Sequence, residues 1–336
     1  MDWDLFAGIT AQEWKELYDL AKIHGIVAVV FEIIKNIPKE FSPPRPLIMS
    51  WYAHALKIER QMQEREKVSQ DLARIMSDNG IGVTVLKGMA FAEYYPNPYH
   101  RESGDLDCYL MGNKDEGDKV LVEAGADIKD AGYKHSNLYW KGLVIENHKF
   151  ITSFDNTARG IRTEKLLQQM IKEATRPIGN SKLLNPGAAF NAIFLVKHAQ
   201  RHFFKEGICI RHLLDWAFFL RTERYNLQWN EILSLMDECG ILNFAKVMTT
   251  LCEINLGMAY GIEGLEYDSS LVWEVNEDIM NGLSEMSNET LYSKAIRISR
   301  RFLRMWKYRE LSDESYMRML WNSFAFSSYL HRKPQI

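Results

Sequence analysis

Two aspartates, Asp105 and Asp107, are separated by a single residue at the start of a short apolar stretch, DLDCYL. On a β-strand successive side chains point to opposite faces, so both carboxylates share one face while Leu106, Cys108 and Leu110 share the other. Aspartate is a poor strand former, and two like charges on one face repel each other. We therefore expect either that this face is solvated or that a cation lies on it. Carboxylate oxygens are the ligands that Mg²⁺ prefers, so the pair is a candidate metal site.

The sequence around these aspartates alternates between strand and helix patterns. Before them, a β-rich run, IGVTVLKG, precedes a short helical segment, MAFAEYY. After them, an amphipathic helix is predicted at residues 114–125, with an acidic first turn and a glycine at its end. Two further runs, YKHSNLYW and LVIENHKF, are joined by Lys141-Gly142 and predict a β-hairpin. The segment from residue 81 to about 155 thus predicts a small β-α-β-α-β-β unit.

Helical patterns flank this unit on both sides. Residues 11–36 predict two helices, and a long amphipathic helix is predicted from residue 47 to Asn79-Gly80. We therefore predict an α+β protein whose core is a small mixed sheet. Its three regions are an N-terminal helical region at 1–79, the core at 80–160 and a C-terminal helical domain at 161–336.

Composition limits the class of protein. The 336 residues are 46% hydrophobic and carry a net charge of −3, so the basic balance typical of nucleic-acid-binding proteins is missing and we expect no such partner. The four cysteines are widely spread without a CxxC pair, which is typical of reduced, buried thiols. The N-terminus lacks a signal-peptide pattern, and the apolar run IVAVVF is too short to span a bilayer. We expect a cytoplasmic protein with no membrane partner.

One stretch carries a specific resemblance to a known family. Residues 85–110 contain, in this order, Leu86-Lys87-Gly88, Tyr95-Pro96, Arg101 and Gly104-Asp105-Leu106-Asp107. This series resembles the nucleotidyltransferase superfamily with the polymerase-β-like fold, and within it the branch described as uncharacterised nucleotidyltransferases. The resemblance extends from about residue 50 to 225. It departs from the broader superfamily at Met89, where a serine usually follows the glycine.

The resemblance implies transfer of a nucleoside monophosphate from a nucleoside triphosphate, most often ATP, to a hydroxyl of a small molecule or a protein. It also implies a third carboxylate on a later strand, which Glu146 supplies. Asp105, Asp107 and Glu146 would then be the catalytic residues and would hold Mg²⁺. Two such ions, about 3.5–4 Å apart, stabilise the attacking and the leaving oxygen. Glu146 would complete the first metal site or accept the proton of the acceptor.

Four more residues of the motif would bind the nucleotide. Gly88 has no Cβ and lets the backbone approach the phosphates. Lys87 and Arg101 would neutralise phosphate charge, arginine with two parallel hydrogen bonds. Gly104 precedes the aspartate pair and completes the set.

Plainer interpretations exist for these basic residues. Lys87 at a strand end is also compatible with an ordinary solvated lysine, and Arg101 with an ion pair to Glu102 or Glu93.

For the protein as a whole, the alternative is a catalytically degenerate module that binds a nucleotide or a protein without turnover. A second alternative is a toxin-like modifier of a protein target, which would share the chemistry.

Two further pairs lie at helical i, i+4 spacing. His198 and His202 could bind a metal, although a structural pair is the simpler interpretation because no third ligand lies near them in sequence. For Arg211 and Asp215 the simpler interpretation is an intrahelical salt bridge, and the resemblance leaves open a role toward the nucleotide or the acceptor.

Overall fold

The structure is a computed structural model that describes residues 3–152, 157–281, 291–312 and 315–317. At its centre is one seven-stranded mixed sheet with the strand order β3-β4-β5-β2-β1-β7-β6. The strands are β1 (Val83–Val85), β2 (Asp105–Tyr109), β3 (Asp127–Ala131), β4 (His135–Trp140), β5 (Leu143–His148), β6 (Thr175–Pro177) and β7 (Leu183–Pro186).

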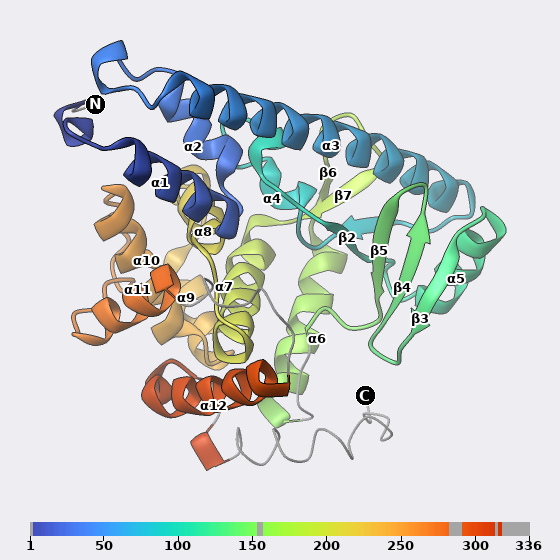
Figure 1. The fold of residues 1–336 in the computed structure, drawn as a ribbon. Coiled ribbons are helices and arrows are strands. Elements are labelled where there is room, and N and C mark those ends of the chain that lie inside the picture. The colour runs from blue at the N-terminus through green and yellow to red at the C-terminus, as the bar shows by residue number, and fades with distance from the viewer. Residues whose placement is uncertain (1–2, 153–156, 282–290, 313–314, 318–336) are drawn as a thin grey trace.

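Along the chain, α1–α3 precede the sheet, α4, α5 and α6 lie between its strands, and α7–α12 follow it. In Figure 1, α3 runs across the top of the molecule from α1 and α2 to the sheet, and α7–α12 lie below those helices. The α-helices are α1 (Ala11–Ile23), α2 (Val27–Ile34), α3 (Arg45–Asp78), α4 (Met89–Ala92), α5 (Lys114–Glu123), α6 (Ala158–Glu173), α7 (Ala188–Lys205), α8 (Ile210–Glu223), α9 (Trp229–Glu238), α10 (Leu242–Leu256), α11 (Leu271–Asn281) and α12 (Leu291–Lys307). Within the described part of the chain, no helix combines the length and the hydrophobicity that crossing a bilayer requires.

The predicted α+β architecture is confirmed, but the sheet is larger than the predicted unit. Strand β3 is exposed along its whole length, so its sequence DIKDA shows no alternation of apolar and polar residues. Strands β6 and β7 are three and four residues long and each contains a proline, which argues against a strand in sequence terms. Strand β7 is recognisable only because it pairs in parallel with β1. The sheet therefore continues beyond residue 160, where we expected the core to end.

The register of the central strands aligns the predicted site residues. Strand β2 pairs antiparallel with β1 and parallel with β5. Asp107 lies opposite Glu146, and Asp105 lies opposite Val144. Two segments that are far apart in sequence therefore bring their carboxylates to neighbouring positions.

Two turns depend on glycine or on a left-handed backbone. Gly88 ends the segment after β1 with φ +58°, and a Cβ at this position would lie 2.9 Å from the hydroxyl of Ser103. Lys141 and Gly142 have φ of 47° and 83°, as the tight turn of the predicted hairpin requires. The hairpin itself is confirmed.

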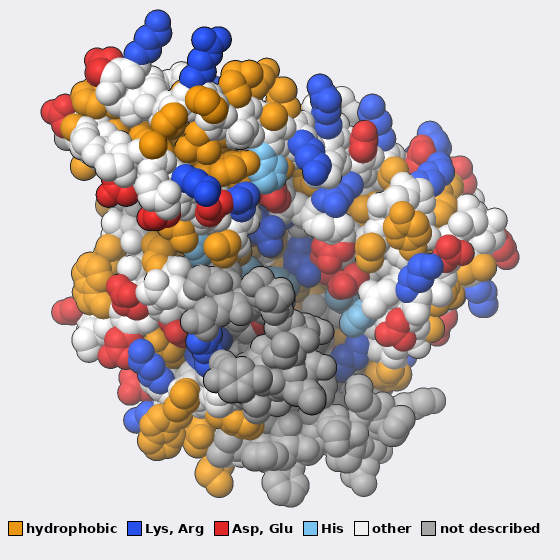
Figure 2. All heavy atoms as spheres, viewed as in Figure 1, with side chains coloured by type: hydrophobic (Ala, Val, Ile, Leu, Met, Phe, Trp, Pro, Cys, Tyr) orange, Lys and Arg blue, Asp and Glu red, His pale blue; other side chains and the backbone are white. Residues whose placement is uncertain are grey.

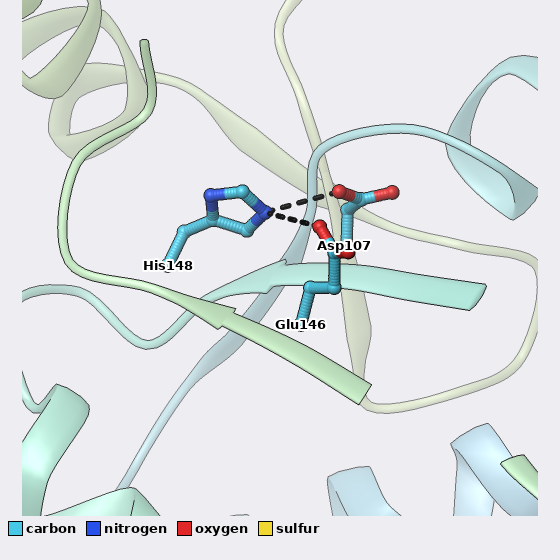
Figure 3. Close-up of side chains that lie close together, drawn as sticks. All are labelled: Asp107, Glu146 and His148. Carbon is cyan, nitrogen blue, oxygen red and sulfur yellow. Dashed lines mark hydrogen bonds and ion pairs between the residues drawn. The ribbon is translucent and has the colours of Figure 1, made fainter. Parts of the chain in front are cut away.

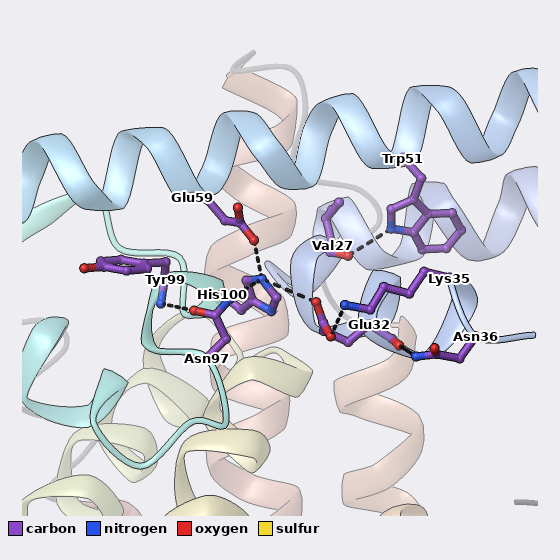
Figure 4. Close-up of polar contacts among 9 residues, drawn as sticks. All are labelled: Val27, Glu32, Lys35, Asn36, Trp51, Glu59, Asn97, Tyr99 and His100. Carbon is purple, nitrogen blue, oxygen red and sulfur yellow. Dashed lines mark hydrogen bonds and ion pairs between the residues drawn. The ribbon is translucent and has the colours of Figure 1, made fainter.

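Helix α3 is joined to the turn that follows α4. His100 Nε2 lies 2.7 Å from Glu59 Oε1 on α3, and the side-chain nitrogen of Asn97 lies 2.8 Å from the same ring atom (Figure 4). Trp51, also on α3, donates from its indole nitrogen to the carbonyl of Val27 on α2. The His100–Glu59 contact therefore joins the segment after α4 to α3, and the Trp51–Val27 bond joins α3 to α2.

Candidate active site

The site is built around Asp107, whose side chain is 2% exposed. Lys87, just after β1, places its Nζ 2.7 Å from Asp107 Oδ1. His148 at the end of β5 lies with Nε2 3.0 Å from the same oxygen and 3.4 Å from Glu146 Oε2 (Figure 3). Both basic groups converge on one carboxylate oxygen, because β1 and β5 are the two neighbours of β2 in the sheet.

The chain itself thus supplies cationic groups to the strand face that carries the aspartates. Burial raises the pKa of Asp107, but the hydrogen bond from His148 and the charge of Lys87 outweigh it, and the net pKa lies well below its usual value. Burial lowers the pKa of His148, and its contacts with Asp107 and Glu146 reverse this, so the net pKa is raised. Asp107 is therefore held as a carboxylate, the form in which it can bind a cation.

Asp105 shares the strand face of Asp107 but has a different environment. Its pKa is raised, first by burial and then by the charges of Asp107 and Glu146, with Lys87 opposing the shift. Its side chain is not part of the group formed by Asp107, Glu146 and His148. It lies beside Gly88 on the wall of a cavity under α3.

The group formed by Asp107, Glu146 and His148 fits a divalent cation. Among the described residues, the one group of three potential ligands is Asp107, Glu146 and His148, whose ligand atoms all lie within 4.8 Å of one another. Carboxylate oxygens suit Mg²⁺ and Mn²⁺, while an imidazole is more typical of transition metals. That the ammonium of Lys87 lies against Asp107 indicates that this position attracts positive charge. Asp105 offers a further carboxylate on the same strand face.

His148 is a site residue that sequence reasoning missed. It stands two positions after Glu146 on the same strand, so alternation places both on one face. This spacing is the signal in the sequence that could identify His148 as a site residue. The ring of His135, on β4, lies 5.4 Å from that of His148.

Arg101 is engaged in a buried ion pair. Its Nε and Nη2 donate to the two oxygens of Asp215 at 2.8 and 2.7 Å, and the hydroxyl of Tyr95 donates to the same carboxylate at 2.7 Å. Burial raises the pKa of Asp215, but the charge and hydrogen bonds of Arg101 dominate and the net pKa is lowered. Pairing of Arg101 with Glu102 or Glu93 is therefore wrong, since Asp215 is its partner.

The intrahelical salt bridge between Arg211 and Asp215 is also wrong. Arg211 Nη1 instead donates to the backbone carbonyl of Glu102 at 3.0 Å. Helix α8 thus holds the segment before β2 through two arginine contacts, one from Arg211 to Glu102 and one from Arg101 to Asp215. Because these contacts join distant parts of the chain, i, i+4 spacing could not reveal them.

Gly104 precedes β2, and a Cβ added there would meet no atom within 4 Å. The fold thus leaves space for a side chain at this position, unlike at Gly88. A role of Gly104 in nucleotide binding stays a prediction.

The histidines of α7 form a cluster with His212 of α8. The rings of His198 and His202 lie 4.4 Å apart, and His212 lies 6.3 and 5.9 Å from them. Nδ1 of His202 contacts Glu206, and Nδ1 of His212 accepts a hydrogen bond from the backbone nitrogen of Cys209. Burial lowers the pKa of His212 to about 3. In the described residues this cluster does not meet the distances of a metal site, so the structural interpretation of the histidine pair is favoured.

Acidic, basic and histidine side chains gather in a hollow between the sheet and the C-terminal helices (Figure 2).

The four cysteines, all within the described residues, are buried and form no disulfide.

A glycine turn, a lysine and neighbouring carboxylates on the central strands of a mixed sheet are an arrangement by which phosphate-transferring proteins can hold a charged substrate. The chain belongs to a family of uncharacterised nucleotidyltransferases, whose family model matches residues 10–257. No curated protein and no solved structure matches it. The matched range covers the N-terminal helices, the whole sheet and α7–α10.

Proposed function

We propose that this protein is a Mg²⁺-dependent nucleotidyltransferase that moves a nucleoside monophosphate from a nucleoside triphosphate to a hydroxyl group. The observation that carries this proposal is the register of β2 and β5, which aligns Asp107 with Glu146 beside the turn at Gly88. ATP is the donor we would test first, and the acceptor is a small molecule or a protein side chain.

In the proposed reaction the acceptor oxygen forms a bond to the α-phosphorus. The bond from that phosphorus to the bridging oxygen breaks, pyrophosphate leaves, and the hydroxyl proton passes to a carboxylate. Mg²⁺, when bound, would neutralise charge on the triphosphate and make the acceptor hydroxyl more acidic. Asp105, Asp107 and Glu146 would hold it, and His148, which contacts both Asp107 and Glu146, would lie beside it.

Each remaining residue has a role that its position supports. Lys87 neutralises Asp107 in the absence of a metal, and it would turn to the phosphates once Asp107 binds a cation, because its side chain is 22% exposed and flexible. Gly88 begins α4 and brings its backbone close to the phosphates. Glu146, 28% exposed, is accessible enough to accept the acceptor proton.

The roles of Arg101 and Gly104 are less direct. Arg101 lines the cavity beside Gly88 while its guanidinium is paired with Asp215, so we assign it to positioning the segment before β2 rather than to phosphate binding. Gly104 keeps the entry to β2 free of side chains.

The experiment is a turnover assay with each of the four nucleoside triphosphates, Mg²⁺ and a panel of hydroxyl acceptors, in which pyrophosphate release and labelled product are both measured. Glu146→Gln should lose turnover, while the exposed Glu123→Gln, on α5, should retain it. Absence of both nucleotide binding and pyrophosphate release in the parent would overturn the proposal. Binding of Mg²⁺ and nucleotide without turnover on any acceptor would favour the degenerate module instead, for which Met89 after the glycine is the supporting feature.

A further inference from the structure

A cavity of about 230 Å³ lies under α3 and opens beside Gly88 and Asp105. Its walls come from α3, from α4, from the turn before β2 and from the segment between β6 and β7. Most of the lining is apolar, with Met62, Met89 and Ile178 among its side chains. Mostly apolar walls with a few polar groups are typical of pockets for small molecules.

Most polar side chains on the wall are already engaged. Glu66 accepts a hydrogen bond from the hydroxyl of Tyr99 at 2.8 Å. Glu93 forms an ion pair with Arg176 at 3.1 Å, and Arg101 is paired with Asp215. These groups therefore shape the cavity without offering themselves to a ligand.

Two polar side chains of α3 differ from these. Ser69 is 1% exposed, and its hydroxyl has no hydrogen-bond partner. Arg65, half-buried on the same wall, makes no hydrogen bond or ion pair with any residue that the structure describes. A buried hydroxyl without a partner costs free energy, roughly 1–3 kcal/mol, unless a ligand satisfies it.

The two groups lie one helical turn apart in α3, on the wall of the same cavity. Burial lowers the pKa of Arg65, and the charges of Asp105 and Glu102 oppose this shift, so the guanidinium lies within reach of the Asp105 charge on the same cavity wall. Leu106 and Leu143 add to the apolar part of the wall. The cavity thus combines a cationic group near Asp105 with mostly apolar walls and one buried hydroxyl.

A nucleotide has groups that match these three features, namely charged phosphates and a flat, largely apolar base with a hydrogen-bonding edge. We infer that this cavity holds the nucleobase of the donor nucleotide, with the Ser69 hydroxyl bonded to the edge of the base and Arg65 near the sugar-phosphate junction. This inference rests on the proposed function and adds to it the group that selects the base.

The test separates the base from the phosphates. Binding of a non-hydrolysable analogue of each nucleoside triphosphate is measured by calorimetry with Mg²⁺, next to inorganic tripolyphosphate, which has no base. Ser69→Ala should reduce the preference between the best and the worst base by roughly 5- to 10-fold, the effect of one lost hydrogen bond. Ser69→Val, which fills the cavity, should weaken all four analogues and leave tripolyphosphate unchanged.

Matched controls come from the same helix. Ser77→Val, at an exposed position of α3, should change none of these affinities. Arg65→Gln should weaken the analogues, whereas Lys67→Gln, at an exposed position, should not. The metal-free Ser69→Ala protein should be as stable as the parent or more stable, because an unsatisfied hydroxyl is removed, so a loss of binding would not reflect misfolding.

The possible outcomes distinguish this inference from the proposed function. If both Ser69 variants bind the analogues with the affinity and base preference of the parent, the inference is overturned. Binding of tripolyphosphate by the same variants would still support the phosphate site of the proposed function. Unchanged nucleotide affinity with lost turnover would place the acceptor in the cavity and also overturn it. Failure of the parent to bind any analogue or tripolyphosphate would overturn the proposed function itself.

Discussion

Asp107 and Asp215 are both buried aspartates with basic partners, and they hold those partners in different ways. Asp215 receives two parallel hydrogen bonds from Arg101 and one from Tyr95, and the arginine is only 8% exposed. Asp107 uses one oxygen for both Lys87 and His148, which are 22% and 17% exposed.

This difference separates a fixed contact from an exchangeable one. A bidentate, buried arginine pair is costly to break, because the remaining charge would be left without a partner. A lysine has a flexible stem and a single point charge, and solvent can reach it. The Asp215 centre therefore suits a structural role, and the Asp107 centre suits a site where one cation is replaced by another.

The largest expected effect follows from removing the charge of Asp107. Asp107→Asn should reduce nucleotidyl transfer at least about 1000-fold, because several kcal/mol of charge stabilisation would be lost and about 1.36 kcal/mol corresponds to tenfold in rate. It should also abolish the rise in melting temperature that Mg²⁺ and nucleotide give the parent. Asp127→Asn, on the exposed edge strand, is the control. If the two variants behave alike, Asp107 is not part of the catalytic centre.

The next largest effect is a loss of stability when the buried pair of Arg101 and Asp215 is broken. Arg101→Met should lower the free energy of unfolding by about 3–5 kcal/mol, since Asp215 would remain buried and charged. Arg176→Met breaks a more exposed pair with Glu93 and should cost less than about 1 kcal/mol. Denaturant titrations of both variants measure the difference. A stable Arg101→Met protein with weakened nucleotide binding would instead make Arg101 a phosphate ligand.

A smaller effect is expected at Lys87. Lys87→Ala should weaken binding of the nucleoside triphosphate about 10-fold and leave folding largely intact, because His148 still contacts Asp107. Calorimetric titration with and without Mg²⁺ checks this. Lys129→Ala on the exposed strand β3 serves as the control. Unchanged affinity would mean that Lys87 only neutralises Asp107.

The smallest effect is a pH dependence of stability due to Asp215. The pKa of its carboxyl in the folded protein lies below the unfolded value of about 3.9. The contribution of Asp215 to the free energy of unfolding is therefore complete above the unfolded pKa and is lost as the pH falls through the folded pKa. Urea unfolding between pH 6 and pH 3 should show a steeper loss for the parent than for Asp215→Asn. Equal slopes would show that other carboxyl groups account for the acid sensitivity.

The sequence predicted the segments that carry the site better than it predicted their partners. The motif around Asp105 and Asp107, the hairpin with Glu146 and the long helix α3 all follow local rules of alternation, turn chemistry and helix periodicity. Strand β7 and the edge strand β3 were missed, because one is defined by its pairing with β1 and the other has no buried face. His148 was within reach of the alternation argument.

By itself, the sequence determined which side chains share a strand face and where the glycine turn stands, since these follow from backbone geometry over a few residues. Only the tertiary structure decided that Arg101 pairs with Asp215, 114 positions away, and that Ser69 of α3 lies on a cavity wall beside Gly88. Contacts of this kind depend on how whole elements pack. Local spacing therefore identifies the charged groups of this protein, and packing decides which of them are fixed and which remain accessible to a ligand.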